Sequence, residues 1–508
     1  MEVLSVFDML KVGIGPSSSH TLGPWRAIQR WLAELDESLD EDGGLAAVER
    51  IQVHLYGSLA LTGRGHATDQ AIALALLGHD PETVDVDDIA NLVAALRDRR
   101  SLSLDGRSAP IALDLDSDIV FHPDECLPGH ANAMTCVASA GGRSLKSTYF
   151  SVGGGFVLRH DELGDDELGE EGTDRTRGGQ PTLRYPTQKP DDLRSHCVAT
   201  EGRIADVVWT NELAWRTPDE IRAGLDALWR VMVEGVYRGC HTVGTLPGGL
   251  GVQRRAAPLV RLLLSDDRID DDSLAEGALV DENSVDAWLE RIRGGDHDFG
   301  QVLQWISAFA MATNEENANL GRVVTAPTNG AAGVIPAVLL YYLCLADDVD
   351  DRSAPDARIV VHDFLLVAGE VGTLFKKGAT ISAAMGGCMA EVGVSSAMAA
   401  AALTEAMGGN PDQALMAAEI AMEHHLGMTC DPVSGLVQVP CIERNTMGAV
   451  KAINAAGLAI AGDPAAARVT LAEVIDTMRD TAESMSDRFK ETSLGGLAVN
   501  VSVRVPEC

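Results

Sequence analysis

The stretch "GATISAAMGGCMAEVGVSSAMAAAAL" (residues 378–403) decides the fold of the second half of the chain, because almost all of its residues are small. Alanine favours helices and small side chains let helix backbones approach closely, whereas strands favour β-branched and aromatic residues. We therefore expect a helix that is tightly enclosed by other helices. The composition agrees, since 46% of the 508 residues are hydrophobic but only 4% are aromatic.

Helical signals surround this stretch from about residue 205 onward. Segment 217–236 opens with a capping box, Thr217 to Glu220, and its apolar residues recur at helical spacing. Segment 410–427 repeats the arrangement, with an Asn–Pro pair as its start and a glycine as its stop. Segment 463–485 does so again from an Asp–Pro pair. No strong strand is predicted in this half.

In the first part of the chain, apolar residues recur at every second position, as in a strand, and not at helical spacing. Ile51, Val53 and Leu55 alternate with polar residues, which predicts a half-buried strand. Segment 68–78 predicts a short helix with Thr68 as its N-cap. Two further β-rich segments, 110–121 and 147–158, follow it.

These patterns predict an α+β fold in three parts. Residues 1–160 form an N-terminal mixed α/β domain. Residues 161–204 form an acidic, glycine-rich linker without periodicity. Residues 205–508 form an all-helical domain that ends in a C-terminal tail.

The net charge of −35 and the pI of about 4.6 exclude a basic-patch function. Nucleic acid and anionic lipid surfaces repel such a chain. The N-terminus lacks the basic and apolar regions of a signal peptide. The most apolar segment, 331–346, is shorter than the roughly 20 residues that span a bilayer and contains Pro336. We expect a buried helix there and a cytoplasmic protein.

Three cysteines of the helical half stand in irregular segments. Cys388 follows two glycines, Cys430 precedes a proline and Cys441 follows another proline. Thiolates are soft ligands for zinc or iron–sulfur clusters. The spacings of 42 and 11 residues match no CxxC signature, so by spacing alone buried structural cysteines are the better interpretation.

Hydroxyl and imidazole groups gather in four other segments. Such loops can present hydroxyls and backbone N–H groups to a carboxylate, and a helix N-terminus favours an anion. Taken singly, each segment is more often an ordinary polar loop, a helix cap or a solvated histidine. The candidates are Ser17, Ser18, Ser19 and His20 in segment 15–24, His66 in segment 62–70, His130 and Asn132 in segment 127–135, and Thr328, Asn329 and Gly330 in segment 325–336.

Together these segments resemble the oxygen-sensitive iron–sulfur L-serine dehydratases of bacteria, in their single-chain form. The resemblance covers nearly the whole chain in one order, and the segments that carry least of it are the linker and residues near 265–300. The motifs are "GPSSSHT" (15–21), "GRGHATDQAI" (63–72), "YFSVGGGFV" (149–157), "APTNGAAGVIPAVL" (326–339), "KKGATISAAMGGCMAEVGVSSAMAAAAL" (376–403) and "HHLGMTCDPVSGLVQVPCIERN" (424–445).

The resemblance implies a [4Fe–4S] cluster held by Cys388, Cys430 and Cys441, with one iron free of these ligands. An open iron is a Lewis acid for the departing β-hydroxyl of L-serine, and His66 matches the residue thought to take the α-proton. The aminoacrylate product then yields pyruvate and ammonia. In similar chains a terminal cysteine caps the fourth iron when substrate is absent, and Cys508 matches that residue.

The same resemblance assigns the carboxylate and amino group of the substrate to Ser17, Ser18, Ser19, His20, Asn132, Thr328, Asn329 and Gly330. In one departure, the family often shows "HPNGM" where residues 130–134 read "HANAM", so the turn that orients Asn132 differs. Because segment 15–24, called the serine loop below, and the three cysteines lie in different predicted domains, we expect the active site between the domains. A homodimer is expected by resemblance. The first domain also resembles serine-binding regulatory folds, so activation by serine is a further hypothesis.

Two alternatives stay open at this point. A pyridoxal-phosphate dehydratase would use Lys376 or Lys377 as Schiff-base lysine and "SVGGGFV" (151–157) as phosphate loop, and it would contain no iron. A non-catalytic regulator would bind serine without releasing pyruvate and would tolerate the loss of Cys388.

Overall fold

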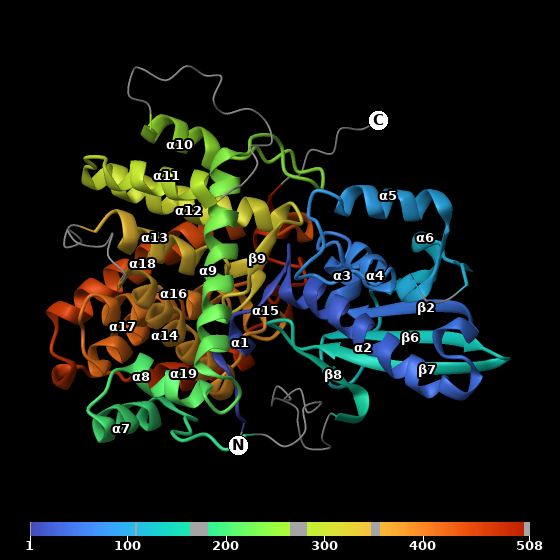
Figure 1. Ribbon diagram of the computed structural model, residues 1–508, viewed down its shortest axis with the longest axis horizontal. Coiled ribbons are helices and arrows are strands. Elements are labelled where there is room, and N and C mark those ends of the chain that lie inside the picture. Colours follow the sequence, from blue (N-terminus) through green and yellow to red (C-terminus); the bar gives the residue numbers. More distant parts are fainter. Residues whose placement is uncertain (1, 107–108, 163–180, 265–281, 347–355, 502–508) are drawn as a thin grey trace.

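The computed structural model describes residues 2–106, 109–162, 181–264, 282–346 and 356–501. A mixed α/β part, at the right of Figure 1, lies beside a larger helical part. The strands of the main sheet all precede residue 160, and helices dominate after residue 190. The predicted fold class is confirmed.

The α/β part is built on a five-stranded sheet with the order β5-β2-β6-β7-β8. Only the β5–β2 pair is parallel. A hydrophobic core of buried residues, among them Trp25, Trp31, Val53 and Leu55, joins the sheet to its helices. The strands are β2 (Val48–Gly57), β5 (Ile119–His122), β6 (Asn132–Ala140), β7 (Arg143–Ser151) and β8 (Val157–Arg159), and the helices are α2 (Gly23–Ser38), α3 (Ser58–Thr62), α4 (Thr68–Leu76) and α5 (Ile89–Arg99).

Two sequence predictions for this part are corrected. Segment 110–121 is not one strand, because the Asp114 side chain caps a helical turn, α6 (Leu115–Asp118), between two short strands. The N-cap of α4 is Ala67 and not Thr68. The Thr68 hydroxyl instead donates to the carbonyl of His20 at 2.6 Å, so it joins two candidate site segments.

The helical part is organised around α16 (Val392–Ala406), which is buried from Val392 to Glu405. It packs against four other helices, α13, α14, α17 and α18, as the run of small residues predicts. The helices of this part are α7 (Pro190–Thr200), α8 (Ile204–Glu212), α9 (Pro218–His241), α10 (Ala256–Leu264), α11 (Glu282–Arg293), α12 (Phe299–Ala318), α13 (Val334–Cys344), α14 (Asp356–Gly378), α15 (Ala383–Gly386), α17 (Pro411–Glu423), α18 (Cys441–Ala461), α19 (Leu471–Ser484) and α20 (Leu497–Asn500).

Several helix limits differ from the prediction. Helix α17 ends at Glu423, before the expected glycine stop. Helix α19 begins after Thr470, since Asp463 caps only a short turn. Part of the predicted linker forms α7, while residues 163–180 lie outside the described residues.

The predicted buried helix in segment 331–346 is confirmed as α13, in which all residues but Tyr341 are buried. In the described part of the chain, no single helix has both the length and the hydropathy to cross a bilayer, although the bent pair Ala383–Met389 and Val392–Ala406 reaches that threshold jointly.

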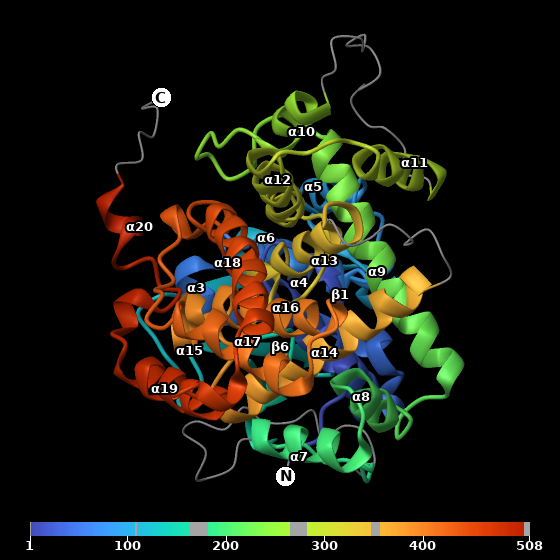
Figure 2. The same cartoon turned by 90° about the vertical axis from the view of Figure 1, so that its left-hand side faces the viewer.

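The start of the chain belongs to the helical part in its packing. Helix α1 (Val6–Met9) contacts α14, and β1 (Val12–Ile14) pairs antiparallel with β9 (Arg322–Val324). Strand β9 was not predicted, because three residues are too few for a period. Since β1 leads directly into the serine loop, this pairing fixes that loop against the helical half. Figure 2 labels β1 among the helices.

Candidate active site between the two halves of the chain

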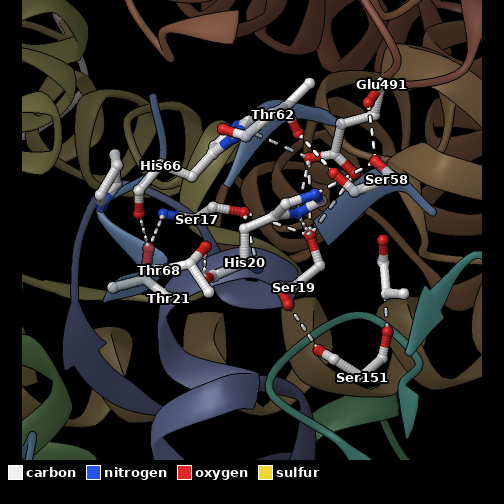
Figure 3. A network of polar contacts seen from close by, with 12 residues as sticks. Ser17, Ser19, His20, Thr21, Ser58, Thr62, His66, Thr68, Ser151 and Glu491 are labelled. Carbon is white, nitrogen blue, oxygen red and sulfur yellow. Dashed lines mark hydrogen bonds and ion pairs between the residues drawn. The ribbon is translucent and has the colours of Figure 1, made fainter. Parts of the chain in front are cut away.

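The serine loop forms one wide helical turn, Ser18–Leu22, that leads into α2. Ser17 begins it, and its hydroxyl accepts the backbone N–H of His20 at 3.2 Å. The hydroxyls of Ser17 and Ser19 are 3.1 Å apart, and Ser19 Oγ lies 2.8 Å from His20 Nδ1. All of these side chains are buried, so the turn presents an internal row of hydroxyl groups (Figure 3).

His66 lies in a turn between α3 and α4 that is pressed against the helical half. A Cβ on Gly65 would be 2.7 Å from the carbonyl oxygen of Gly435, so this close approach requires glycine. His66 Nδ1 is 2.9 Å from the carbonyl oxygen of Thr62. Because that partner can only accept, Nδ1 carries the proton and Nε2 keeps a free lone pair. Burial lowers the pKa of His66 to about 4, so the ring is a neutral base at pH 7.

His20 is also fully buried and neutral, since burial and the nearby His66 lower its pKa well below the usual value. Its Nε2 lies 3.1 Å from Ser58 Oγ. Ser58 Oγ in turn donates to the backbone carbonyl of Glu491 at 2.8 Å. The Ser58 hydroxyl proton is therefore engaged by that carbonyl and cannot be donated to His20. His20 Nε2 must then carry the ring proton and donate to Ser58, while His20 Nδ1 accepts the Ser19 hydroxyl.

Glu491 comes from the segment after α19, more than 400 residues from the serine loop. Its carboxylate lies 3.5 Å from Ser19 Oγ, 3.5 Å from His20 Nδ1 and 3.8 Å from His66 Nε2. Burial, and after it the charges of Glu391 and Cys388, raise its pKa well above the usual value. Figure 3 shows this residue facing the serine loop and both histidines.

Asn132 reaches the same place because β6 begins beside the end of β2, where it pairs with Gly57. Its amide donates to the carbonyl of Ser151, whose hydroxyl donates to the carbonyl of Ser19 at 2.6 Å. The backbone N–H of Asn132 donates to His130 Nδ1 at 3.0 Å. The turn that lacks proline and glycine is thus held by His130. Among the described residues, Asn132 Oδ1 has no hydrogen-bond partner.

The second cluster is built around Cys388, in the break between α15 and α16. Gly387 has φ +68°, and a Cβ there would be 2.7 Å from the Met428 carbonyl oxygen, so the turn depends on glycine. The thiols of Cys388 and Cys430 and a carboxylate oxygen of Glu391 lie within 4.8 Å of one another. This group can hold a metal centre.

Cys441 is the first residue of α18 and joins this cluster. Burial, and then the neighbouring Cys388 thiolate, raise its pKa well above the usual value. A hydrogen bond with Cys388, and then burial, do the same for Cys430. Buried thiols so close together are ionised only at a high cost unless a cation binds them. Three converging sulfur donors fit an iron–sulfur cluster or another soft metal centre.

Arg444 places a positive charge beside the Cys388 sulfur. Its guanidinium donates to Cys388 Sγ at 3.2 Å, to the carbonyl of Thr429 at 2.6 Å and to Asp431 at 2.8 Å. A hydrogen bond to sulfur tunes a metal thiolate. Arg444 follows Cys441 by three residues on one face of α18, and Glu391 follows Cys388 by three.

The segment Thr328–Gly330 lies at the start of α13, facing the cysteine cluster. A Cβ on Gly330 would be 3.0 Å from a carboxylate oxygen of Glu391. Asn329 donates from its amide to the carbonyl of Ile14 at 3.1 Å, which holds the chain start in place. The segment Thr328–Gly330 thus borders the cysteine cluster through Glu391.

Two clusters form one site. The histidine cluster consists of His20, His66 and Glu491, and the cysteine cluster consists of Cys388, Glu391, Cys430 and Cys441. The backbone N–H of Glu491 donates to the Cys430 carbonyl at 3.0 Å, and the N–H of Cys430 donates to the carbonyl of Phe489 at 2.8 Å. Asp431 accepts the N–H of Leu497 at 2.8 Å, so the chain after α19 is fastened beside Cys430. The predicted ligand Cys508 lies outside the described residues.

A cavity of about 450 Å³ lies at the outer side of the His66 turn. Its lining includes Arg64, Gly65, Ala67 and Gln438, but neither the two histidines nor the cysteines. It borders the site and does not contain its reactive groups.

The two lysines of the pyridoxal-phosphate alternative have other partners. Lys376 Nζ is 3.0 Å from a carboxylate oxygen of Glu2, and Lys377 Nζ donates to the carbonyl of Thr187 at 2.7 Å. The glycine turn of "SVGGGFV" packs on Ile381 and Ser382. These contacts disfavour that alternative.

Sequence reasoning missed Glu391, Arg444, Ser58 and Glu491. The spacing of three residues from a cysteine could have indicated Glu391 and Arg444. Glu491 had no such signal, because it stands 50 residues after Cys441 in an irregular segment and meets the histidines only through the tertiary fold.

Comparison with known proteins gives a consistent result. Residues 199–498 match the family model of the serine dehydratase alpha chain, and residues 5–162 match that of the serine dehydratase beta chain. The chain is 46% identical to an L-serine dehydratase of Streptomyces coelicolor, over 98% of this chain and 99% of the relative. It is 44% identical to that of Mycobacterium tuberculosis (99% and 100%) and 42% identical to L-serine dehydratase TdcG of Escherichia coli (98% and 99%).

Proposed function

This chain belongs to the serine dehydratase family of lyases, and we propose that it converts L-serine to pyruvate and ammonia with a [4Fe–4S] cluster and a histidine base. The observation that carries the proposal is that Glu491 links a group of buried thiols, Cys388, Cys430 and Cys441, to the neutral, buried His66 between the α/β part and the helical part. The substrate lies between them.

Cys388, Cys430 and Cys441 would hold the cluster, and Arg444 would orient Cys388. When bound, the cluster supplies a Lewis-acidic iron that stabilises hydroxide as it leaves the β-carbon. Three protein thiolates leave one of four irons without a protein ligand from this set.

His66 takes the α-proton at Nε2. The hydrogen bond from Nδ1–H to Thr62 fixes the tautomer and helps to stabilise the cation that forms. Burial keeps the ring neutral before the reaction. In the enzyme without substrate, His66 therefore has an unprotonated Nε2 that can accept the α-proton.

The carboxylate and amino group of L-serine are bound by Ser17, Ser18, Ser19, His20, Asn132, Thr328, Asn329 and Gly330 in this proposal. The support is that these residues are buried, and that their segments contact the serine loop or the cysteine cluster. Several of their polar atoms, such as Asn132 Oδ1, have no partner within the described part of the chain.

Pyruvate release from L-serine under anaerobic conditions, compared with D-serine, tests the activity. Rapid release from L-serine alone is expected. Serine binding without pyruvate would instead favour the regulator, and turnover blocked by hydroxylamine would favour pyridoxal phosphate.

The pH dependence reports the base. His66 must be neutral to act, and burial lowers its pKa to about 4. We expect kcat/KM to keep its full value down to about pH 5 and to fall only as the pH approaches 4. An acid limb near the ordinary histidine pKa of about 6.5 would contradict this. The measurement is the kcat/KM profile for L-serine, with activity rechecked at pH 8 after each exposure.

We also propose that Cys508 caps the fourth iron until substrate displaces it. Leu497 is held beside Cys430 through Asp431, and Cys508 follows Leu497 by eleven positions. Such a segment spans up to about 35 Å when extended, so it can return to the cluster.

Deleting Cys508 should leave an assembled cluster that is more easily lost in air, and it should change the lag before steady turnover. The decay of visible absorbance and the progress curves measure both effects. Glu507→Gln, which keeps the thiol and the tail length, serves as control. A deletion variant that matches the wild type in both measurements would rule out the cap.

By family likeness we propose a homodimer in the cytoplasm. Activation by L-serine at a second site in the α/β part stays a hypothesis of the same kind.

A further inference from the structure

The carboxylate of Glu491 is buried among hydrogen-bond acceptors. Among the described residues, its side-chain hydrogen-bond and ion-pair partners are Ser19 Oγ, His20 Nδ1 and His66 Nε2, all within 4 Å. The hydrogen bonds of the site assign the single proton of Ser19 to His20, at 2.8 Å, and leave both ring nitrogens as lone pairs. The two Ser19–Glu491 contacts are 3.5 Å long, at the limit of a hydrogen bond.

The ionised form of Glu491 is unfavourable in the empty site. A buried carboxylate needs donors or a cation, and each missing partner costs free energy. Here three acceptors of the chain converge on one small space and none of them has a proton to give to the carboxylate. A group with positive charge and several N–H donors would satisfy all of them at once.

We infer that Glu491 binds the α-ammonium group of the substrate and so selects α-amino acids over α-hydroxy acids. This inference rests on the proposed function, because it takes L-serine as the occupant. The ammonium provides three N–H donors, enough for Glu491 and for neighbouring hydroxyls such as Ser19. The ammonium nitrogen is bonded directly to Cα. An ammonium bound to Glu491 therefore brings the α-proton near His66, whose Nε2 is 3.8 Å from the Glu491 carboxylate.

The backbone of Glu491 is bonded to both halves of the chain. Its backbone N–H bonds to the carbonyl of Cys430, and its carbonyl accepts the Ser58 hydroxyl. The residue is thus held by both halves of the chain. The ammonium is recognised where the cysteine cluster and the histidines meet.

The test compares L-alanine with L-lactate as inhibitors of the anaerobic holoenzyme. The two molecules differ only in the ammonium, which L-lactate replaces with a hydroxyl, and neither has a β-hydroxyl to lose. In the wild type we expect L-alanine to bind at least about tenfold more tightly than L-lactate. In Glu491→Gln this preference should fall to within about threefold, and KM for L-serine should rise at least about thirtyfold.

Two further variants make the result specific. Glu491→Asp keeps the charge, so it should recover part of the preference. Glu419→Gln replaces another buried glutamate, in α17, and should leave the preference unchanged. Iron content and visible absorbance of each variant show whether the cluster is assembled.

Equal weakening of L-alanine and L-lactate in Glu491→Gln would overturn the inference and indicate a structural role. A fall in kcat with unchanged L-alanine binding would also overturn it, since Glu491 would then act in the chemical step. If Glu491→Gln does not assemble, an equal affinity of the wild type for the two inhibitors would decide against it. Failure of the proposed function is distinct, because the wild type would then release no pyruvate.

Discussion

Cys388→Ser is expected to lose the cluster and to reduce pyruvate formation at least about a thousandfold. Lewis-acid stabilisation of a leaving group is worth several kcal/mol, and each 1.4 kcal/mol is about a factor of ten. Cys388 is central to the cluster, since its thiol contacts Cys430 and receives the Arg444 guanidinium. Serine keeps the size of the side chain but is a much poorer ligand for iron.

The measurements are iron and sulfide per chain, visible absorbance and pyruvate release, all made without oxygen. Cys197→Ser is the matched control, because Cys197 is equally buried but lies in α7, away from the cluster. The control should keep iron and activity. A Cys388→Ser enzyme that retains both would show that Cys388 is a structural cysteine, as the spacing alone suggests.

His66→Asn is expected to lower kcat for L-serine about 10³-fold, within the range for removal of a general base. Asparagine is chosen because its amide can still donate to the Thr62 carbonyl, as His66 Nδ1 does. It has no atom that corresponds to Nε2. The cluster should assemble normally, and KM should change little, because the substrate is held by other residues.

His241→Asn is the control for His66→Asn, since His241 Nδ1 makes the same contact to a carbonyl four residues earlier. It should keep wild-type kcat. Exchange of the α-proton of bound L-alanine with deuterated solvent provides a separate readout, which His66→Asn should abolish. Unchanged kcat and unchanged exchange would assign the proton transfer to another residue.

The parts of the fold that local patterns determine could be predicted from the sequence. The run of small residues predicts the enclosed helix α16, and the capping box at Thr217 predicts the start of α9. Predictions failed where a side chain served a distant partner. Thr68 looked like a helix cap, but its hydroxyl binds the carbonyl of His20.

The candidate site shows the same limit. Short motifs pointed to the serine loop, His66 and the cysteines, and the fold brings these segments together. Spacing could not indicate a shared centre, because 42 and 11 residues of chain separate the three cysteines. Glu491 escaped notice because its local sequence has no regular pattern, and its partners come from α3, the serine loop and the His66 turn.

The ratio of iron and sulfide to activity tests the central claim most directly. Protein purified without oxygen should contain about four irons and four sulfides per chain when fully loaded. Across preparations that differ in loading, pyruvate release from L-serine should rise in proportion to cluster content and fall as air removes it. Full turnover by protein that contains no iron would contradict the account.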